Sequence, residues 1–143
     1  MNTVFFDIDT QLDFVSPAGA LYAPGAETIL ANVAMLNQRA TVVVSTMDAH
    51  SEDDPEFRAW PHHCVAGCLG QRKPQSTLLE HRVVIPNRDF HPTTARQIIL
   101  EKQTVDCFTS RHLHAILEAL HAGRYVVYGV VTEICVRNAA FGL

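Results

Sequence analysis

Short apolar, β-rich segments separated by helical patterns run through this chain. Strands are predicted at residues 3–8, 41–46, 82–85, 97–100 and 124–131. Strands that are joined through helices pair in parallel by right-handed crossovers. These segments lack a clean alternation of polar and apolar residues, which is typical of strands buried on both faces. The sequence therefore predicts an α/β fold with a mainly parallel sheet flanked by helices.

The helices of this fold are marked by apolar residues at helical spacing. Residues 27–38 and 110–122 carry such stripes, and Thr132 is predicted to cap a third helix. Residues 47–73 show weak periodicity instead and are predicted to form a long loop region. Loops of that length in compact domains usually carry function.

The composition narrows the class of protein. With 143 residues, of which 48% are hydrophobic and 18% charged, the chain is predicted to form one globular domain over residues 1–143. Its net charge of −4 and the lack of a basic block argue against nucleic acid or anionic membrane as partners. Its apolar stretches are far shorter than a membrane span, and its N-terminus lacks a signal-peptide core, so a cytoplasmic location is expected.

Four residues of reactive types follow predicted strands: Asp9, Asp48, Lys102 and Cys135. In open parallel sheets, ligands bind beyond the carboxyl ends of the strands. The topology therefore predicts that these four residues lie at one edge of the sheet, where they can share a site.

Cys135 is the candidate nucleophile among them. If Thr132 caps the last helix, Cys135 lies in its first turn, where the helix dipole lowers the pKa of a thiol and free N–H groups can hold an oxyanion. The alternative is a small buried thiol that fills core space. Asp9 can act as its base and Lys102 can keep both groups ionised, the alternatives being a loop cap and a surface lysine.

The long loop region also holds residues of metal-binding types. Two imidazoles and two carboxylates occur there: Asp48, His50, Glu56 and His63. This set suits a borderline divalent ion such as Zn²⁺, Mn²⁺ or Fe²⁺, although its spacing matches no zinc finger. Residues 53–54 are interpreted as a solvated acidic loop. Phe14 and Trp60 are either core residues or walls of an apolar slot for a flat ring.

Five motifs in order along the chain are similar to one known family. They are DTQLDF (9–14), TMDAH (46–50), WPHHCVAG (60–67), EKQTVDCF (101–108) and GVVTEICV (129–136). Together they resemble the isochorismatase-like cysteine hydrolases, and within them the nicotinamidase/pyrazinamidase branch. The resemblance implies a Rossmann-like three-layer α/β fold.

The resemblance also implies a mechanism. Asp9 deprotonates Cys135 with the help of Lys102, the thiolate attacks a carboxamide carbon, ammonia leaves, and water hydrolyses the thioester. The oxyanion hole is then formed by the backbone N–H groups of Val131 and Cys135, and a cis peptide bond is expected at Val130–Val131.

A cofactor and a substrate follow from the same resemblance. The ligand set of the branch falls on four residues of this chain: Asp48, His50, Glu56 and His63. They are expected to hold one divalent ion, Zn²⁺ or alternatively Fe²⁺ or Mn²⁺. Phe14 and Trp60 fit the aromatic clamp on a small carboxamide substrate, nicotinamide in the first place, which would make the protein part of NAD salvage.

Some positions depart from the pattern of the branch and keep alternatives open. Ala49 stands where an aromatic residue is frequent, Glu133 replaces an Asp, and Cys68 replaces a Thr. One alternative is another amide or carbamoyl hydrolase of the family, with the metal loop serving structure. Another is an inactive metal-binding fragment. Isochorismate hydrolysis fits less well, because cleavage of a vinyl ether needs no thiol.

The family fold continues beyond the nucleophile helix, so the chain is interpreted as truncated at its C-terminus. Without the further strands, residues 125–131 are expected to form a sheet edge, and an apolar edge strand invites pairing with another chain. A homo-oligomer, in which a partner subunit covers this edge, is therefore expected as the alternative to a truncated gene.

Overall fold

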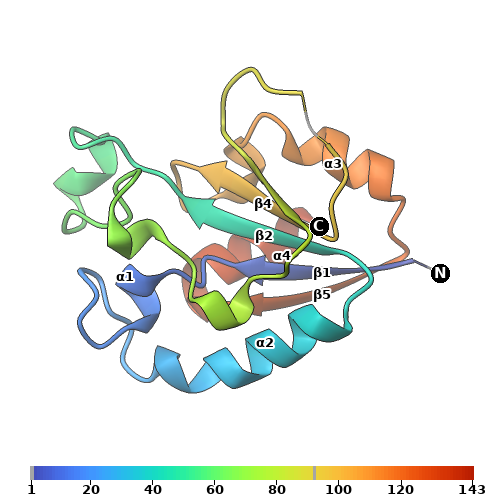
Figure 1. Ribbon diagram of the computed structural model, residues 1–143. Helices are drawn as coiled ribbons and strands as arrows, with labels where there is room; N and C mark the ends of the chain where they lie inside the picture. The colour runs from blue at the N-terminus through green and yellow to red at the C-terminus, as the bar shows by residue number, and fades with distance from the viewer. Residues whose placement is uncertain (1, 92) are drawn as a thin grey trace.

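The computed structural model describes residues 2–91 and 93–143. Within them, one parallel sheet has the strand order β3-β4-β2-β1-β5 (Figure 1). Its strands are β1 (Thr3–Ile8), β2 (Val43–Asp48), β3 (Arg82–Ile85), β4 (Gln97–Lys102) and β5 (Arg124–Gly129). The predicted parallel sheet is confirmed. Two strands end later than predicted, so that Asp48 and Lys102 are the last residues of β2 and β4.

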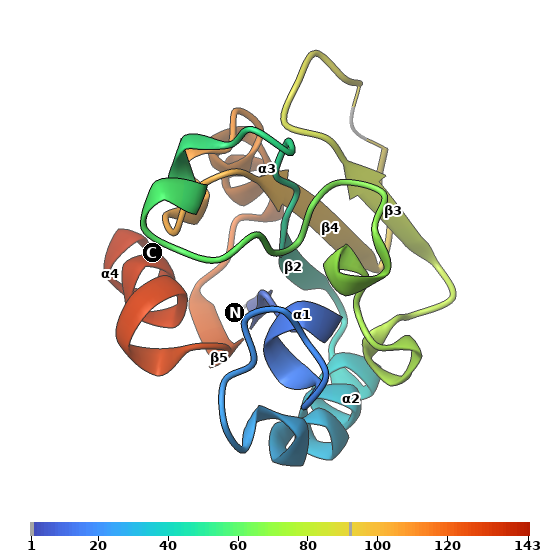
Figure 2. The same cartoon turned by 90° about the vertical axis from the view of Figure 1, so that its left-hand side faces the viewer.

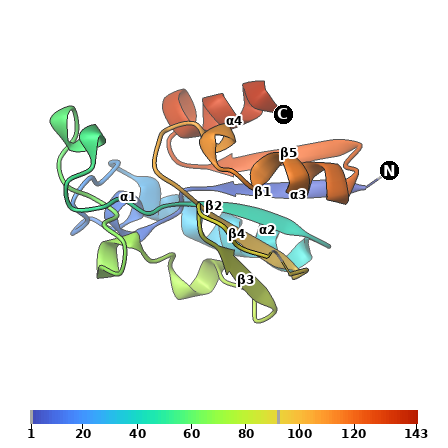
Figure 3. The same ribbon diagram turned by 90° about the horizontal axis from the view of Figure 1, so that it is seen from above.

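Helices cover both faces of this sheet. Helix α2 (Leu30–Arg39) lies on one face, and α3 (Leu113–Leu120) and α4 (Arg137–Gly142) lie on the other, as Figure 3 shows. The three-layer α/β fold implied by the sequence is thereby confirmed. The main core lies between the sheet and α3, where the side chains of Phe6, Leu100 and Leu113 are fully buried.

The carboxyl ends of the strands face the viewer in Figure 2. The short helix α1 (Leu12–Val15) and the long segment after β2 surround this end, and α4 lies to one side of it. The segment after β2 has only short 3₁₀ turns, among them Pro55–Arg58. It is therefore the long loop region that the sequence predicted.

The helix ends differ from those predicted. Helix α3 starts only at Leu113 and stops at Leu120, because His121 adopts a left-handed conformation with φ of 45°. Thr132 is not a cap: it is the first residue of a π-helical turn, Thr132–Val136, whose N-cap residue is Val131. Cys135 is therefore the fourth residue of that turn.

Strand β5 lies at one edge of the sheet, and its side chains are at most partly buried. This agrees with the edge position expected for residues 125–131. None of the helices in residues 2–91 and 93–143 has the length and hydropathy needed to cross a membrane.

A buried ion pair lies on the α2 face of the sheet. The Nζ of Lys73 lies 3.3 Å from the Oδ2 of Asp7, and it donates a hydrogen bond of 3.0 Å to the Oγ1 of Thr10. Asn37 and Ser45 also donate to the Oδ2 of Asp7, at 3.3 and 3.2 Å. The side chains of Asp7 and Lys73 are 0% and 1% exposed, so each charge depends on these partners.

Candidate active site and metal centre

The sheet brings Asp9, Lys102 and Cys135 to one edge. Asp9 follows the last residue of β1, Lys102 ends β4, and Cys135 lies in the turn after β5. The Nζ of Lys102 lies 2.9 Å from the Oδ2 of Asp9, and both side chains are fully buried. Because these strands run in parallel, residues far apart in the sequence end at the same side of the molecule. Their catalytic roles are still predictions.

Thr46 fixes the orientation of the Asp9 carboxylate. The Thr46 Oγ1 donates a 2.6 Å hydrogen bond to the Oδ1 of Asp9 and accepts one of 3.2 Å from the Asp9 N–H. The Oδ2 of Asp9 has no regular hydrogen-bond partner in the described part of the chain, although Lys102 pairs with it by charge. Lys102 is therefore the group that balances the charge on this oxygen.

Burial and charge set the protonation of the three groups. Burial raises the pKa of Asp9, and the charge of Lys102 opposes that rise. Burial works against the charged form of Lys102, but Asp9 and Asp48 hold its pKa well above the ordinary value. Burial and the Asp9 carboxylate raise the pKa of the Cys135 thiol. The predicted lowering of this pKa at the helix terminus is therefore wrong.

A substitution at Thr46 tests this electrostatic description. Thr46→Val removes a hydrogen bond that lowers the pKa of Asp9, while keeping the size of the side chain. The pKa of Asp9 then rises further. Because Asp9 accepts a proton only when ionised, the acidic limb of kcat/KM against pH is expected to move to higher pH. An unchanged acidic limb would contradict Asp9 as the base.

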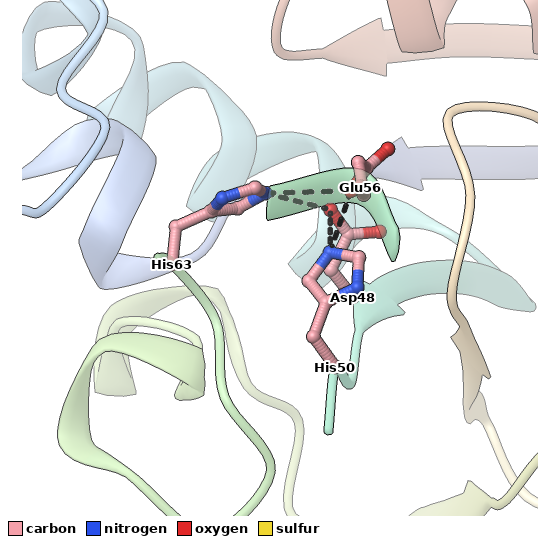
Figure 4. Close-up of side chains that lie close together, drawn as sticks. All are labelled: Asp48, His50, Glu56 and His63. Carbon is pink, nitrogen blue, oxygen red and sulfur yellow. Dashed lines mark ion pairs between the residues drawn. The ribbon is translucent and has the colours of Figure 1, made fainter. Parts of the chain in front are cut away.

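Four side chains form a second cluster beside the first (Figure 4): Asp48, His50, Glu56 and His63. One potential ligand atom from each lies within 4.8 Å of the others. The Nε2 of His50 is 2.9 Å from the Oε2 of Glu56 and 3.6 Å from the Oδ2 of Asp48. The Nε2 of His63 is 3.6 Å from the same Glu56 oxygen. The structure thus brings together all four residues proposed from the sequence as metal ligands.

The imidazoles of this cluster are oriented as metal-binding imidazoles usually are. The Nδ1 of His50 lies 2.9 Å from the Oδ2 of Asp54, and the Nδ1 of His63 lies 2.6 Å from the Pro61 carbonyl oxygen. Both Nε2 atoms therefore face the cluster, and that of His50 is buried without a regular hydrogen-bond partner among the described residues. Two imidazoles and two carboxylates arranged in this way fit a divalent ion such as Zn²⁺. Asp54 is thus not part of a solvated loop.

The cluster carries a strong negative potential. Burial lowers the pKa of His50, but the carboxylates of Asp48, Glu56 and Asp54 outweigh it and raise the pKa to about 10. Burial likewise raises the pKa of Asp48, yet Lys102 and His50 hold it below its ordinary value. A group of carboxylates that holds a proton so tightly on an imidazole also favours a divalent cation in that place.

Asp48 joins the two clusters. Its Oδ1 accepts a 2.5 Å hydrogen bond from the Nζ of Lys102, while its Oδ2 faces the imidazoles. Gln11 holds the main chain of Asp48 from both sides, since its Nε2 donates to the Asp48 carbonyl at 2.9 Å and its Oε1 accepts from the Asp48 N–H at 2.8 Å. Gln11 lies within the motif DTQLDF, but this role could not be predicted from its residue type and its position in the motif.

A cavity of about 190 Å³ is shared by the two clusters. Cys135 lines it together with three of the four candidate metal ligands, Asp48, Glu56 and His63. Phe14 and Trp60 contribute aromatic walls, as expected for an apolar slot, and their contact with a substrate stays a prediction. Further walls come from residues 21–23 and from Val105, to which the sequence assigned no role. Residues 21–23 belong to no motif, and Val105 lies in the motif of residues 101–108 but carries no reactive group.

The turn before Cys135 has the backbone that the resemblance implied. The peptide bond Val130–Val131 is cis, which confirms that expectation. The carbonyl oxygen of Val131 accepts from the N–H groups of Ile134 and Val136, each at 3.2 Å. An oxyanion hole formed by the N–H groups of Val131 and Cys135 remains a prediction.

Comparisons with known proteins agree with this fold. The family model described as the isochorismatase domain matches residues 3–143. A pyrazinamidase of Pyrococcus horikoshii, solved in complex with zinc, is 27% identical with a TM-score of 0.81, over 99% of this chain and 78% of that one. An N-carbamoylsarcosine amidase of Thermoplasma acidophilum is 25% identical with a TM-score of 0.74, over 99% and 75% of the two chains.

One curated relative carries a different description. A probable inactive nicotinamidase of Arabidopsis thaliana is 22% identical over 153 residues, which cover 98% of this chain and 71% of the relative. The family model, in contrast, matches nearly every residue of the chain. The protein therefore belongs to the isochorismatase-like hydrolase family.

Proposed function

We propose that the protein is a metal-containing cysteine amidohydrolase that converts nicotinamide and water into nicotinate and ammonia. The observation that carries the proposal is that Cys135 and three of the four candidate metal ligands line one cavity. A nucleophile and a centre for a heteroaromatic nitrogen thus face one small space. The similarity to a pyrazinamidase solved with zinc supports the same substrate class.

The first half of the reaction forms a thioester. The Cys135 thiol transfers its proton to the Asp9 carboxylate, and the thiolate attacks the carboxamide carbon. The backbone N–H groups of Val131 and Cys135 stabilise the resulting oxyanion. Collapse of the tetrahedral species breaks the C–N bond, and the proton on Asp9 passes to the leaving group, which departs as ammonia.

The second half regenerates the enzyme. A water molecule gives a proton to Asp9 while its oxygen attacks the thioester carbonyl carbon, and the acid leaves as the proton returns to the Cys135 sulfur. Lys102 stays charged throughout, because Asp9 and Asp48 both stabilise its ammonium group. It therefore holds the Asp9 carboxylate in place without donating a proton.

Asp48, His50, Glu56 and His63 would hold the divalent ion. When bound, the ion supplies an electron-pair acceptor for a ring nitrogen or its bound water. The substrate ring is oriented by Phe14, whose ring centroid lies 5.4 Å from that of His63, and by Trp60 on the cavity wall. These contacts align the carboxamide with Cys135 and exclude bulk water.

The similarity to an N-carbamoylsarcosine amidase favours one second candidate, a hydrolase of small carbamoyl compounds. The similarity to a probable inactive nicotinamidase favours an inactive metal-binding chain as a further candidate. The three candidates differ in what the protein releases and from which substrate.

An ammonia-release assay on the protein, combined with metal analysis, tests the proposal. The zinc-loaded protein is expected to release ammonia and nicotinate from nicotinamide, and to lose this activity on chelation and regain it with Zn²⁺. Release from N-carbamoylsarcosine alone would select the second candidate. Release from neither substrate, with the metal bound, would support the inactive chain and contradict the amidase.

A further inference from the structure

Asp54 contacts two of the candidate metal ligands at once. Its Oδ2 lies 2.9 Å from the Nδ1 of His50, and its Oδ1 accepts a 2.9 Å hydrogen bond from the backbone N–H of Glu56. The Asp54 side chain is only 10% exposed. One carboxylate thus touches a ligand that follows β2 and a ligand in the next 3₁₀ turn.

The local sequence fixes Asp54 in this place. Pro55 is the first residue of the 3₁₀ turn Pro55–Arg58, and a residue that precedes proline avoids the helical conformation. Asp54 accordingly has φ of −56° and ψ of 132° and serves as the N-cap of the turn. Its carboxylate is therefore directed back toward His50 while it holds the amide of Glu56.

We propose that Asp54 is a positioning residue of the metal centre, which orients His50 and Glu56 together for a divalent cation such as Zn²⁺. The inference rests on the metal centre of the proposed function. An imidazole that is held at Nδ1 keeps its Nε2 aimed at the metal and becomes a stronger donor. The cap on the Glu56 amide fixes the main chain from which the second carboxylate reaches the same point.

His63 shows why Asp54 is the informative position. The outer nitrogen of His63 is held by the Pro61 carbonyl, a main-chain group that substitution does not remove. The outer nitrogen of His50 is held by a side chain. Loss of the Asp54 carboxylate therefore changes the alignment and the basicity of His50, while all four candidate ligand residues are kept.

Two substitutions and a matched control test this inference. Asp54→Ser keeps a hydroxyl that can cap the Glu56 amide but loses the carboxylate on His50. Asp54→Asn keeps the shape of the side chain, but its one carbonyl oxygen can accept from only one of the two N–H groups. Asp53→Asn removes the same charge from the adjacent position, whose side chain is exposed.

The measurement is the Kd for Zn²⁺ of the metal-free protein, in competition with a chromophoric chelator. Both Asp54 variants are expected to bind Zn²⁺ about 10- to 100-fold more weakly than the unsubstituted protein. Asp53→Asn is expected to stay within about threefold, the effect of an exposed charge. Circular dichroism of the metal-free variants shows whether weaker binding comes from altered ligand positions or from loss of the fold. The same titration with Mn²⁺ serves as a second probe.

Two results would overturn the inference: Asp54 variants that bind Zn²⁺ as tightly as the unsubstituted protein, or an Asp53→Asn variant that is weakened as much as they are. Normal affinity in Asp54→Ser alone would reduce the role of Asp54 to capping and so overturn the part that concerns His50. An unsubstituted protein that binds no Zn²⁺ would instead contradict the metal centre itself, a failure of the proposed function that this assay shows separately.

Discussion

Ammonia release from nicotinamide is expected to fall by at least about 10³-fold in Cys135→Ala, and by a similar factor in Asp9→Asn. Without the thiol no thioester can form, and without the carboxylate the thiol has no base to accept its proton, while burial still raises its pKa. The measurement is kcat/KM for nicotinamide in the zinc-loaded proteins. Zinc content must stay unchanged, since neither residue belongs to the metal cluster.

The double variant sharpens this test. Groups that act as one unit give losses that do not add, so Cys135→Ala with Asp9→Asn is expected to be no less active than either single variant. Cys68→Ser, which alters an exposed thiol, is the matched control and is expected to keep full activity. Full activity in Cys135→Ala would refute the thioester mechanism, and losses that multiply would refute the partnership of the two residues.

The second large effect concerns stability. Lys73→Met is expected to lower the free energy of unfolding by about 3–5 kcal/mol, because it leaves the buried Asp7 carboxylate without its cation. Thr10, Asn37 and Ser45 still donate to Asp7, but none of them carries a charge. Urea unfolding followed by circular dichroism measures the change.

The double variant Asp7→Asn with Lys73→Met separates two contributions to the loss of stability: the broken ion pair and the lost packing of the lysine stem. It is expected to be more stable than Lys73→Met alone, since no buried charge is then left unpaired. If both variants are equally unstable, packing of the lysine stem and not the ion pair would explain the loss. A Lys73→Met protein as stable as the unsubstituted one would show that Asp7 needs no cation.

The order of elements predicted much of the fold and the placement of the candidate site. Parallel strands end at one edge, so Asp9, Asp48 and Lys102 could be brought together from their positions behind strands alone. Strands that are buried on both faces are apolar along their length, and this pattern can be recognised without knowing which strands pair. The placement of the metal cluster could not be predicted from the order of the strands alone. Most of its members lie in a loop region, whose path is set by capping and by contacts with α1.

The protonation of Cys135 could not be predicted in this way. A position near a helix end is visible in the sequence, but the burial of the sulfur and the nearby Asp9 carboxylate, which raise its pKa, are not. The same holds for Thr46, one of several polar residues in β2, and for Asp54 in an acidic run. Their roles arise from single side-chain contacts, with Asp9 and with His50, for which periodicity has no signal.

The sequence contains two lysines, Lys73 and Lys102, and both lie buried against carboxylates. Amine-directed chemistry, such as acylation by activated esters, aldehyde cross-linking or ubiquitin transfer, therefore finds neither ε-amino group on the native surface. Each becomes accessible only when its surroundings open. Lysine modification of this protein is thus a measure of its opening, and mass spectrometry of the two sites would distinguish the α2 face of the sheet from the edge that carries the candidate catalytic residues.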